Sequence, residues 1–353
     1  MTLYIFKRLL LMLPTLLGIL FFTFLIIQFV PGGPVEQLVN KLSGLDSITE
    51  SSSSSNTYRG SNGLSDEHIE QLNKFYGFDK PFLERFFIMI GNYASFDLGM
   101  SYFHNQSVGD LILSKLPVSI SLGLWSFIIV YLVSIPLGIK KAVNDGSRFD
   151  IISSTIVLIG YSIPGFVLGI GLIVLLGGGS FFDIFPTRGL VSDDWSNLSV
   201  IEKILDYLWH ITLPIICLII GSFAVMTMLT KNSFIDEINK LYTVTARAKG
   251  LSENKVLYSH VFKNAIIPIL TGFPAQFVSA FFTGSILIET IFSLDGIGLL
   301  SYEAIIQRDY PVVMGTLFIF TLIGLLTKLI TDIMYVYVDP RIKFTSSSTQ
   351  RNL

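Results

Sequence analysis

The residues that could bind a metal or act as nucleophiles are few and lie far apart in the chain. The single cysteine, Cys217, sits inside a long apolar run, so no disulfide can form within the chain. The four histidines fall in different loops or at the ends of different helices, so we expect no shared metal site. They are His68, His104, His210 and His260.

Sequence signatures of enzymes are missing as well. The chain has no Gly-x4-Gly-Lys-Ser/Thr loop, which would bind ATP phosphates, and no Gly-x-Ser-x-Gly or His-Glu-x-x-His motif. We therefore expect no catalytic residue, metal or cofactor in this chain. Any ATP that drives it must be bound by a partner.

A polar stretch between two strongly apolar segments holds the densest group of candidate binding residues. Before it, Phe234, Ile238 and Leu241 recur at the spacing of one helix face. Gly250 stands where a left-handed cap would end that helix, and Ser252 can cap a second one. The pattern predicts a helix, a glycine turn and a helix that form a docking surface, not a catalytic site.

Membrane helices must position these residues, because the chain is too apolar for an ordinary soluble domain. Its mean hydropathy is +0.64, and 51% of its residues are hydrophobic and 14% charged, against about 25% charged in soluble proteins. We predict an all-α polytopic membrane protein with six transmembrane helices, each long enough for a bilayer that needs about 20 helical residues. The six stretches are Leu9–Val30, Val118–Ile139, Ile151–Leu176, Ile211–Met228, Ile266–Ile288 and Val312–Val338.

The short connections predict the orientation of these helices. Lysines and arginines concentrate at 140–148 and 231–263, whereas the connections after the third and fifth helices carry few. We expect the basic connections and both termini in the cytoplasm. The predicted regions are a cytoplasmic N-terminus with the first helix (1–30), a periplasmic insertion (31–115, flexible to 64 and with short helices from 65), a five-helix core (116–338, with a cytoplasmic loop at 231–265) and a cytoplasmic tail (339–353).

Four polar residues in or beside the membrane helices are candidates for a transport path or gate, because ionised groups at a helix centre cost roughly 2.5–3.5 kcal/mol. Lys328 and Asp332 lie one turn apart, so they either pair with each other or face a path. Glu289 is either a structural carboxylate at the interface or part of an outward gate. Gln276 is expected to form helix-to-helix hydrogen bonds beside the path.

The amino-acid sequence of the polar stretch resembles that of one protein family. Thr245–Leu251, followed by His260 and Asn264–Ala265, is similar to the ATPase-coupling loop of ABC importer permeases of the dipeptide, oligopeptide and nickel branch. It departs from the general importer consensus at 244–245, where that consensus has Glu and Ala. Further stretches extend the resemblance over nearly the whole chain: Tyr76–Pro81, Phe96–Ser101, Leu116–Ser119, Ile288–Ser293 and Arg308–Pro311.

This resemblance implies a type I ABC importer permease fold in the bacterial inner membrane, with several partners. They are a second homologous permease, ABC ATPase subunits that bind ATP and Mg, a periplasmic substrate-binding protein and the lipid bilayer. Nucleic acid is not expected, because the net charge is −2 without a basic cluster. The residues expected to couple to the ATPase are Tyr242, Thr245, Ala246, Arg247, Ala248, Lys249, Gly250, Leu251, His260 and Asn264.

The substrate follows from a narrower resemblance. The stretches at 31–34, 58–60, 147–150 and 230–236 are similar to one subgroup of the branch. That similarity implies import of peptides and of microcin C-type peptide conjugates, and Glu289 could then meet a peptide's amino terminus. A general dipeptide, oligopeptide or nickel permease is the alternative. An ion-coupled secondary transporter, from a different class, would need several paired carboxylates or histidines in the membrane, which the sequence lacks.

Overall fold

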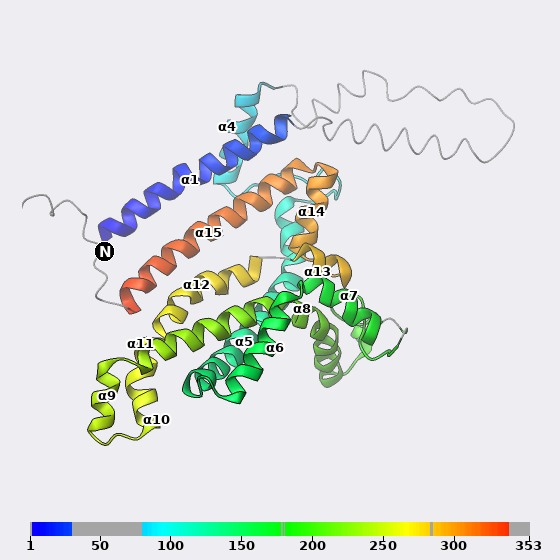
Figure 1. The fold of residues 1–353 in the computed structure, drawn as a ribbon. Helices are drawn as coiled ribbons and strands as arrows, with labels where there is room; N and C mark the ends of the chain where they lie inside the picture. Colours follow the sequence, from blue (N-terminus) through cyan, green and yellow to red (C-terminus); the bar gives the residue numbers. More distant parts are fainter. Residues whose placement is uncertain (1, 30–79, 178, 180, 283–284, 339–353) are drawn as a thin grey trace, which may run out of the picture. The chain divides into compact units, whose positions relative to one another are not determined.

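The computed structural model describes residues 2–29, 80–177, 179, 181–282 and 285–338 (Figure 1). In this part of the chain all regular elements are helices, apart from one isolated bridge between Met100 and Ser107. The predicted all-α class is confirmed. The segment 31–64, which is predicted to be flexible and includes the five serines at 51–55, lies outside the described residues. Contacts divide the chain into two units, one of residues 1–8, 115–299 and 323–353 and the other of residues 9–114 and 300–322.

Among the described residues, four helices are individually long and apolar enough to cross a membrane, and two bent helix pairs raise the number of spans to six if each pair is counted as one. The first pair is α6 (Arg148–Ser162) with α7 (Gly165–Leu176), bent by 94°, and in the second the segment Glu253–Ala265 meets α12 (Ile267–Phe282) at 51°. The four long helices are α1 (Thr2–Phe29), α5 (Val108–Val143), α8 (Val200–Ile238) and α15 (Tyr310–Val338).

The third predicted span is thus broken instead of straight. Ile163 has φ −90° and ψ 119°, as expected for a residue before proline, which is driven out of the helical region. Pro164 then starts α7. A Cβ on Gly165 would lie 2.5 Å from the Cys217 carbonyl oxygen. The glycine therefore lets the start of α7 pack directly on the backbone of α8.

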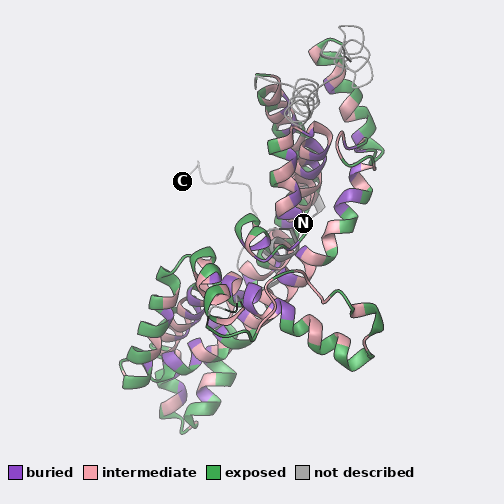
Figure 2. Cartoon of the chain, turned by 90° about the vertical axis from the view of Figure 1, so that its right-hand side faces the viewer, coloured by how far each residue is buried: buried purple, intermediate pink, exposed green. Residues whose placement is uncertain are grey.

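The helix α8 extends well beyond its predicted span at both ends. Ser199 and Glu202 form a capping box at its start, in which the backbone N–H of Ser199 donates to Glu202 Oε2 at 2.8 Å. Its inner face packs with α5, α7 and α13 (Ile286–Ile291) in a core that includes Leu122, Ile211 and Phe292. Many of the large apolar residues are exposed, and Figure 2 colours all exposed residues green. This distribution fits helices surrounded by lipid.

The remaining helices are short. The hairpin that follows α8 contains α9 (Leu241–Ala248), α10 (Glu253–Val256), a π-helical turn (Leu257–Val261) and α11 (Phe262–Ala265). A 3-10 turn (Trp195–Asn197) precedes α8, and α14 (Ile297–Gln307) follows α13. In the second unit, α4 (Phe82–Ala94) packs against α1 through Phe86, whose ring centroid lies 5.3 Å from that of Phe21. The predicted helix that begins near residue 65 lies outside the described residues.

Candidate coupling site and translocation cavity

Gly250 divides the hairpin after α8 into two arms. Its φ of 83° lies in the left-handed region that favours glycine. The N–H of Gly250 donates to the Arg247 carbonyl at 2.9 Å, and that of Leu251 to the Ala246 carbonyl at 3.3 Å. Ser252 has the extended backbone of an N-cap, but its side chain makes no capping hydrogen bond. The glycine turn and the N-cap position of Ser252 are as predicted, whereas the capping hydrogen bond from the serine side chain is not formed.

Most of the residues predicted to couple to an ATPase are accessible. Ala246 is buried, and Tyr242, Arg247 and Leu251 are partly buried. The others form the outer face of the hairpin: Thr245, Ala248, Lys249, Gly250, His260 and Asn264. Two apolar residues share this face, since Leu241 is 85% and Val244 53% exposed. The prediction that Leu241 continues the apolar face of Phe234 and Ile238 in one helix is wrong, because α8 ends at Ile238 and α9 begins at Leu241. Exposed apolar groups beside polar ones are typical of a surface that binds another protein.

Side-chain hydrogen bonds fix the arms of the hairpin to the end of α8. Tyr242 Oη donates to Glu237 Oε2 at 2.5 Å and accepts from Asn264 Nδ2 at 3.2 Å. Burial and the bond to Glu237 raise the pKa of Tyr242. Across the glycine turn, Arg247 Nε pairs with Glu253 Oε1 at 2.9 Å. Tyr242 and Asn264 therefore hold the hairpin together in this chain.

The inner face of the hairpin belongs to a hydrophobic core shared with α5. Ala246, Val256 and Val261 from the hairpin meet Phe234 from α8 and Ile139 from α5. Phe234 and Val261 are fully buried. The inner face of the hairpin is therefore packed directly on two spanning helices.

A buried charge cluster less than one turn from this core joins α5 and α8 to α6. Lys141 on α5 is 0% exposed, and its Nζ lies 3.2 Å from Asp150 Oδ1 and 2.6 Å from Ser154 Oγ on α6. Lys231 on α8 pairs with Asp150 Oδ2 at 2.7 Å and with Asp145 at 2.9 Å. The sequence indicated only that Lys141 and Lys231 are basic loop residues, because nothing in their spacing reveals a shared partner.

Glu289 lies on α13 and is 0% exposed. Its Oε2 accepts a hydrogen bond from the N–H of Leu299 at 2.7 Å, so its carboxyl group caps the first turn of α14. A Cβ on Gly296 would lie 2.7 Å from the Glu289 carboxyl carbon, which leaves no room for a side chain there. Burial raises the pKa of Glu289.

Gln276 lines a cavity of about 750 Å³ between α5, α8, α12 and α13. Tyr131 Oη on α5 donates to Gln276 Oε1 at 3.1 Å, so the helix-to-helix hydrogen bond predicted for this glutamine is present. Glu289 lies at the same cavity, on its α13 side. The structure thus brings Gln276 and Glu289 together.

Lys328 and Asp332 are placed away from that cavity. Asp332 Oδ2 pairs with Arg8 Nη2 at 2.6 Å and accepts from Tyr4 Oη at 3.0 Å. The predicted pairing of Asp332 with Lys328 is therefore replaced by a pairing with α1, while Lys328 is exposed. A lysine that precedes an aspartate by one turn has the less favourable order on a helix, and Arg8 offers a planar guanidinium instead.

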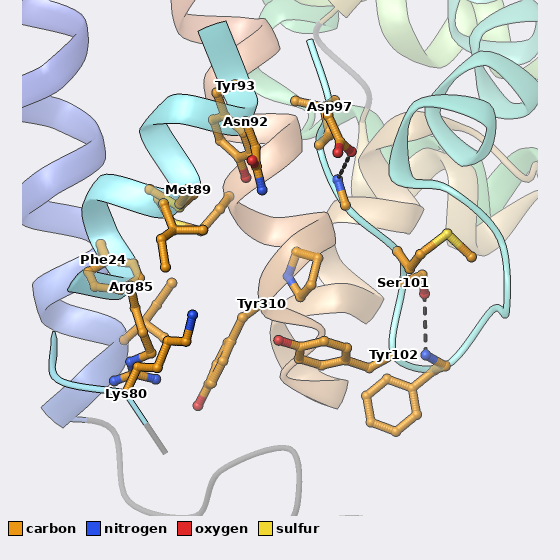
Figure 3. Close-up of a pocket in the computed structure, with 18 of the residues that line it drawn as sticks. Phe24, Lys80, Arg85, Met89, Asn92, Tyr93, Asp97, Ser101, Tyr102 and Tyr310 are labelled. Atoms are coloured by element: carbon orange, nitrogen blue, oxygen red, sulfur yellow. Dashed lines mark hydrogen bonds between the residues drawn. The ribbon is translucent and has the colours of Figure 1, made fainter. Parts of the chain in front are cut away.

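The second unit has a cavity of its own, of about 680 Å³. In Figure 3, Lys80 and Arg85 lie beside Phe24, and the rings of Tyr310 and Tyr102 face them. Asp309, 1% exposed, accepts from Ser101 Oγ and, at 3.2 Å, from the N–H of Tyr102. Two stretches matched separately in the sequence, 96–101 and 308–311, are thus in direct contact.

Comparisons with known proteins agree with this geometry. Residues 134–344 match the sequence profile of the binding-protein-dependent transport system inner membrane component. The chain belongs to this family of ABC transporter permeases. It is a multi-pass inner-membrane transport component and not an enzyme, and membership implies an ATPase and a binding protein as partners.

Individual relatives align over nearly the whole chain. The chain is 58% identical to the "Peptidoglycan transport system permease protein YejB" of Agrobacterium fabrum, over 97% of this chain and 98% of the relative. It is 54% identical to the "Inner membrane ABC transporter permease protein YejB" of Escherichia coli O157:H7, with the same coverage. It is 33% identical to the "Oligopeptide transport system permease protein AppB" of Bacillus subtilis, over 98% of this chain and 100% of that relative. The chain is a YejB-type permease of the peptide branch.

Proposed function

We propose that this chain forms half of the translocation path of an ATP-driven importer for peptides. A second homologous permease supplies the other half. A periplasmic binding protein delivers the substrate, and two ATPase domains bind ATP and Mg on the cytoplasmic side. The names of the relatives, which refer to oligopeptides and to peptidoglycan, support a peptide-containing substrate.

The observation that carries this proposal is the construction of the hairpin around Gly250. Its outer face presents Leu241, Val244 and Lys249, and its inner face is packed on α5 and α8. A surface of this kind can convert closure of an ATPase into movement of the spanning helices. The ten predicted coupling residues are proposed to contact the ATPase either directly, from the outer face, or through Ala246 and Tyr242, which shape that face.

The cycle requires two arrangements of the helices that differ in their ATPase contacts. ATP binding draws the two hairpins of the paired permeases together, and the helices rock to accept substrate from the periplasm. Hydrolysis and release of the ATPase products return them. Because the chain belongs to an ABC permease family, we no longer keep the ion-coupled secondary transporter as an alternative.

For the substrate we propose peptides, including microcin C-type conjugates, with a general dipeptide, oligopeptide or nickel permease as the alternative within the branch. Glu289 caps α14, so its proposed role at the outward gate is to hold that helix. Lys328 and Asp332 lie on α15, where Asp332 is bonded to α1. We propose that they support the path without lining the cavity.

Uptake in a strain that lacks this permease tests the substrate proposal. Cells complemented with the chain should accumulate labelled di- to hexapeptides and become sensitive to microcin C. Nickel uptake should not change. If the chain instead increases nickel uptake and changes neither peptide uptake nor sensitivity to microcin C, the result would contradict the proposal and favour the nickel alternative.

A further inference from the structure

The cavity between α5, α8 and α12 combines an apolar wall with a small set of neutral polar groups. Its volume, about 750 Å³, lies within the range of roughly 300–1,000 Å³ that is typical of small-molecule sites. Leu122, Phe127 and Val225 are among its apolar residues. The polar groups that concern us are Ser126 and Tyr131 on α5, Ser222 on α8 and Gln276 on α12.

Two of these polar groups lie far from the ends of spanning helices. Ser126 falls near the middle of α5 (Val108–Val143), and Ser222 falls near the middle of α8 (Val200–Ile238). Ser222 and Gln276 are exposed on the surface of this chain. Polar groups that face hydrocarbon without partners cost several kcal/mol each. The cavity therefore faces polar material and not lipid tails.

The hydroxyl of Ser126 gives a second, independent indication. Several other hydroxyls on the spanning helices donate to the carbonyl one turn earlier, as Thr212 does to Leu208 and Thr327 to Ile323, both at 2.7 Å. Thr227 Oγ1 on α8 is, like Ser126 Oγ, buried without a partner among the described residues, but Thr227 does not line this cavity. Ser126 Oγ is buried and finds no hydrogen-bond partner among the described residues. A buried, unpaired hydroxyl at a cavity wall indicates that a ligand supplies the partner.

The charged residues of the cavity wall limit which chemical groups of a ligand the cavity can recognise. The described residues of the cavity wall include no lysine, arginine or histidine. Their one carboxylate, Glu289, is 0% exposed. Its Oε2 accepts from the N–H of Leu299, while its Oε1 has no hydrogen-bond partner among the described residues. The remaining polar groups of the wall are neutral hydrogen-bond donors and acceptors. Beside them lie two aromatic rings, those of Phe127 and Tyr131, whose centroids are 4.4 Å apart. Neutral amides match such a wall, whereas a charged side chain would find on it, among the described residues, only the fully buried carboxyl group of Glu289.

We propose that this cavity binds the backbone amides of a transported peptide, through the Tyr131–Gln276 pair and the hydroxyls of Ser126 and Ser222. The inference rests on the proposed peptide import and adds to it which part of the substrate is read. The backbone amide is common to all peptides, so the site accepts them irrespective of side-chain charge.

The first test introduces a charge at the site. Gln276→Glu is made in the full importer, and uptake is compared for three tripeptides whose central residue is Lys, Ala or Glu. The binding protein is the same in the variant and the wild type and can have its own preference among the peptides. Each ratio of uptake between two peptides is therefore divided by the same ratio in the wild type. The ratio of Lys-peptide to Glu-peptide uptake should rise roughly tenfold, since a new carboxylate attracts one side chain and repels the other.

The second test removes one hydroxyl and keeps the shape. Tyr131→Phe should lower uptake of all three peptides by the same factor, roughly 2- to 10-fold for one neutral hydrogen bond. Tyr161→Phe is the matched control, because Tyr161 is 54% exposed on α6 and does not line this cavity. It should transport like the wild type.

Three outcomes would overturn the inference. An unchanged charge ratio in Gln276→Glu at normal abundance and uptake would show that the substrate does not pass this wall, while peptide import itself would stand. A loss in Tyr131→Phe confined to one charge type would show recognition of side chains. If the wild-type importer moves none of the peptides, the proposed function fails and the inference fails with it.

A thiol measurement separates a substrate from a covering partner helix. In a Cys217→Ser background, Ser222→Cys in the assembled importer should react with a small alkylating reagent, and the Ala tripeptide should slow the reaction. A cysteine that stays unreactive with and without peptide would show that the partner permease fills the cavity, which would contradict the proposal.

Discussion

A substitution at Gly250 tests how much the left-handed backbone at this position contributes to the proposed coupling. Nothing lies within 4 Å of the position that a Cβ would take there, so a substitution strains only the left-handed backbone, by roughly 1–2 kcal/mol. A long side chain also projects from the proposed docking face. Gly250→Gln should leave the protein assembled with its partner permease but abolish most substrate-stimulated ATP hydrolysis, measured on the reconstituted importer.

A second glycine provides the control for that experiment. Gly146, between α5 and α6, has φ 71° and is equally free of neighbours. Gly146→Gln therefore introduces the same backbone strain outside the hairpin. It should keep at least half of the stimulated ATPase activity. Equal losses in both variants would mean that strain, and not docking, explains the effect at Gly250.

The contact between Glu289 and Gly296 predicts a strong coupling of two substitutions. Glu289→Ala removes the cap of α14 and should lower stability by about 0.5–2 kcal/mol. Gly296→Ala should cost more, because its Cβ would lie 2.7 Å from the carboxyl carbon. In the double variant the Cβ no longer meets the carboxyl group, so the loss should be smaller than the sum of the two. Thermal unfolding of the purified protein in detergent measures all three.

Additive losses would contradict this description of the α14 cap. Glu289→Gln serves as the conservative control, since a carboxamide oxygen can still accept from the Leu299 N–H. It should retain most of the wild-type stability. A stability as low as that of Glu289→Ala would show that the charge, and not the hydrogen bond, holds α14.

At the scale of elements, the cluster of Lys141, Asp150 and Lys231 ties α5, α6 and α8 together close to the core beneath the hairpin around Gly250. Lys141→Met removes the fully buried cation and leaves Asp150 with Lys231 alone. Breaking a buried pair costs about 3–5 kcal/mol, and the remaining lysine should keep the loss near the lower end. Unfolding in detergent, followed by tryptophan fluorescence, measures it.

The neighbouring residue is a matched control for Lys141. Lys140 is exposed, and its ammonium lies 4.8 Å from the centre of the Phe149 ring. Lys140→Met should change stability by less than about 1 kcal/mol, as expected for an exposed charge. If the two variants were equally stable, the cluster would not be what joins these three helices.

Elements were predictable from the sequence where a local signal determines them. The apolar runs gave the spans, and the positive φ at Gly250 follows from its place at a helix end. The capping box at Ser199 and Glu202 and the proline at 164 are also visible in the sequence, and they account for the long α8 and the bend before α7. The pairing of Asp332 with Arg8 and the burial of Lys141 depend on residues brought together by packing, which no local spacing reveals.

At the scale of the whole molecule, the basic connections predict which side of the membrane each loop occupies. A reporter that is active only in the periplasm should be active when fused after Asp193 and silent when fused after Asp145. Asp145 belongs to the connection that carries the Lys231 ion pair, whereas Asp193 lies between α7 and α8. The reverse pattern of activity would overturn the proposed orientation, with both termini and the hairpin in the cytoplasm.

The central claim is that the hairpin around Gly250 contacts an ATPase, and site-directed cross-linking tests it most directly. Cys217 is the chain's single thiol, so Cys217→Ser gives a background in which one cysteine can be placed at will. Ser252→Cys, exposed beside the glycine turn, should cross-link to the ATPase subunit, with a yield that changes when ATP is added. Ser196→Cys, exposed before α8, should not. No cross-link at Ser252, or labelling of that cysteine by membrane-impermeant reagents from the periplasm, would contradict the coupling role of the hairpin.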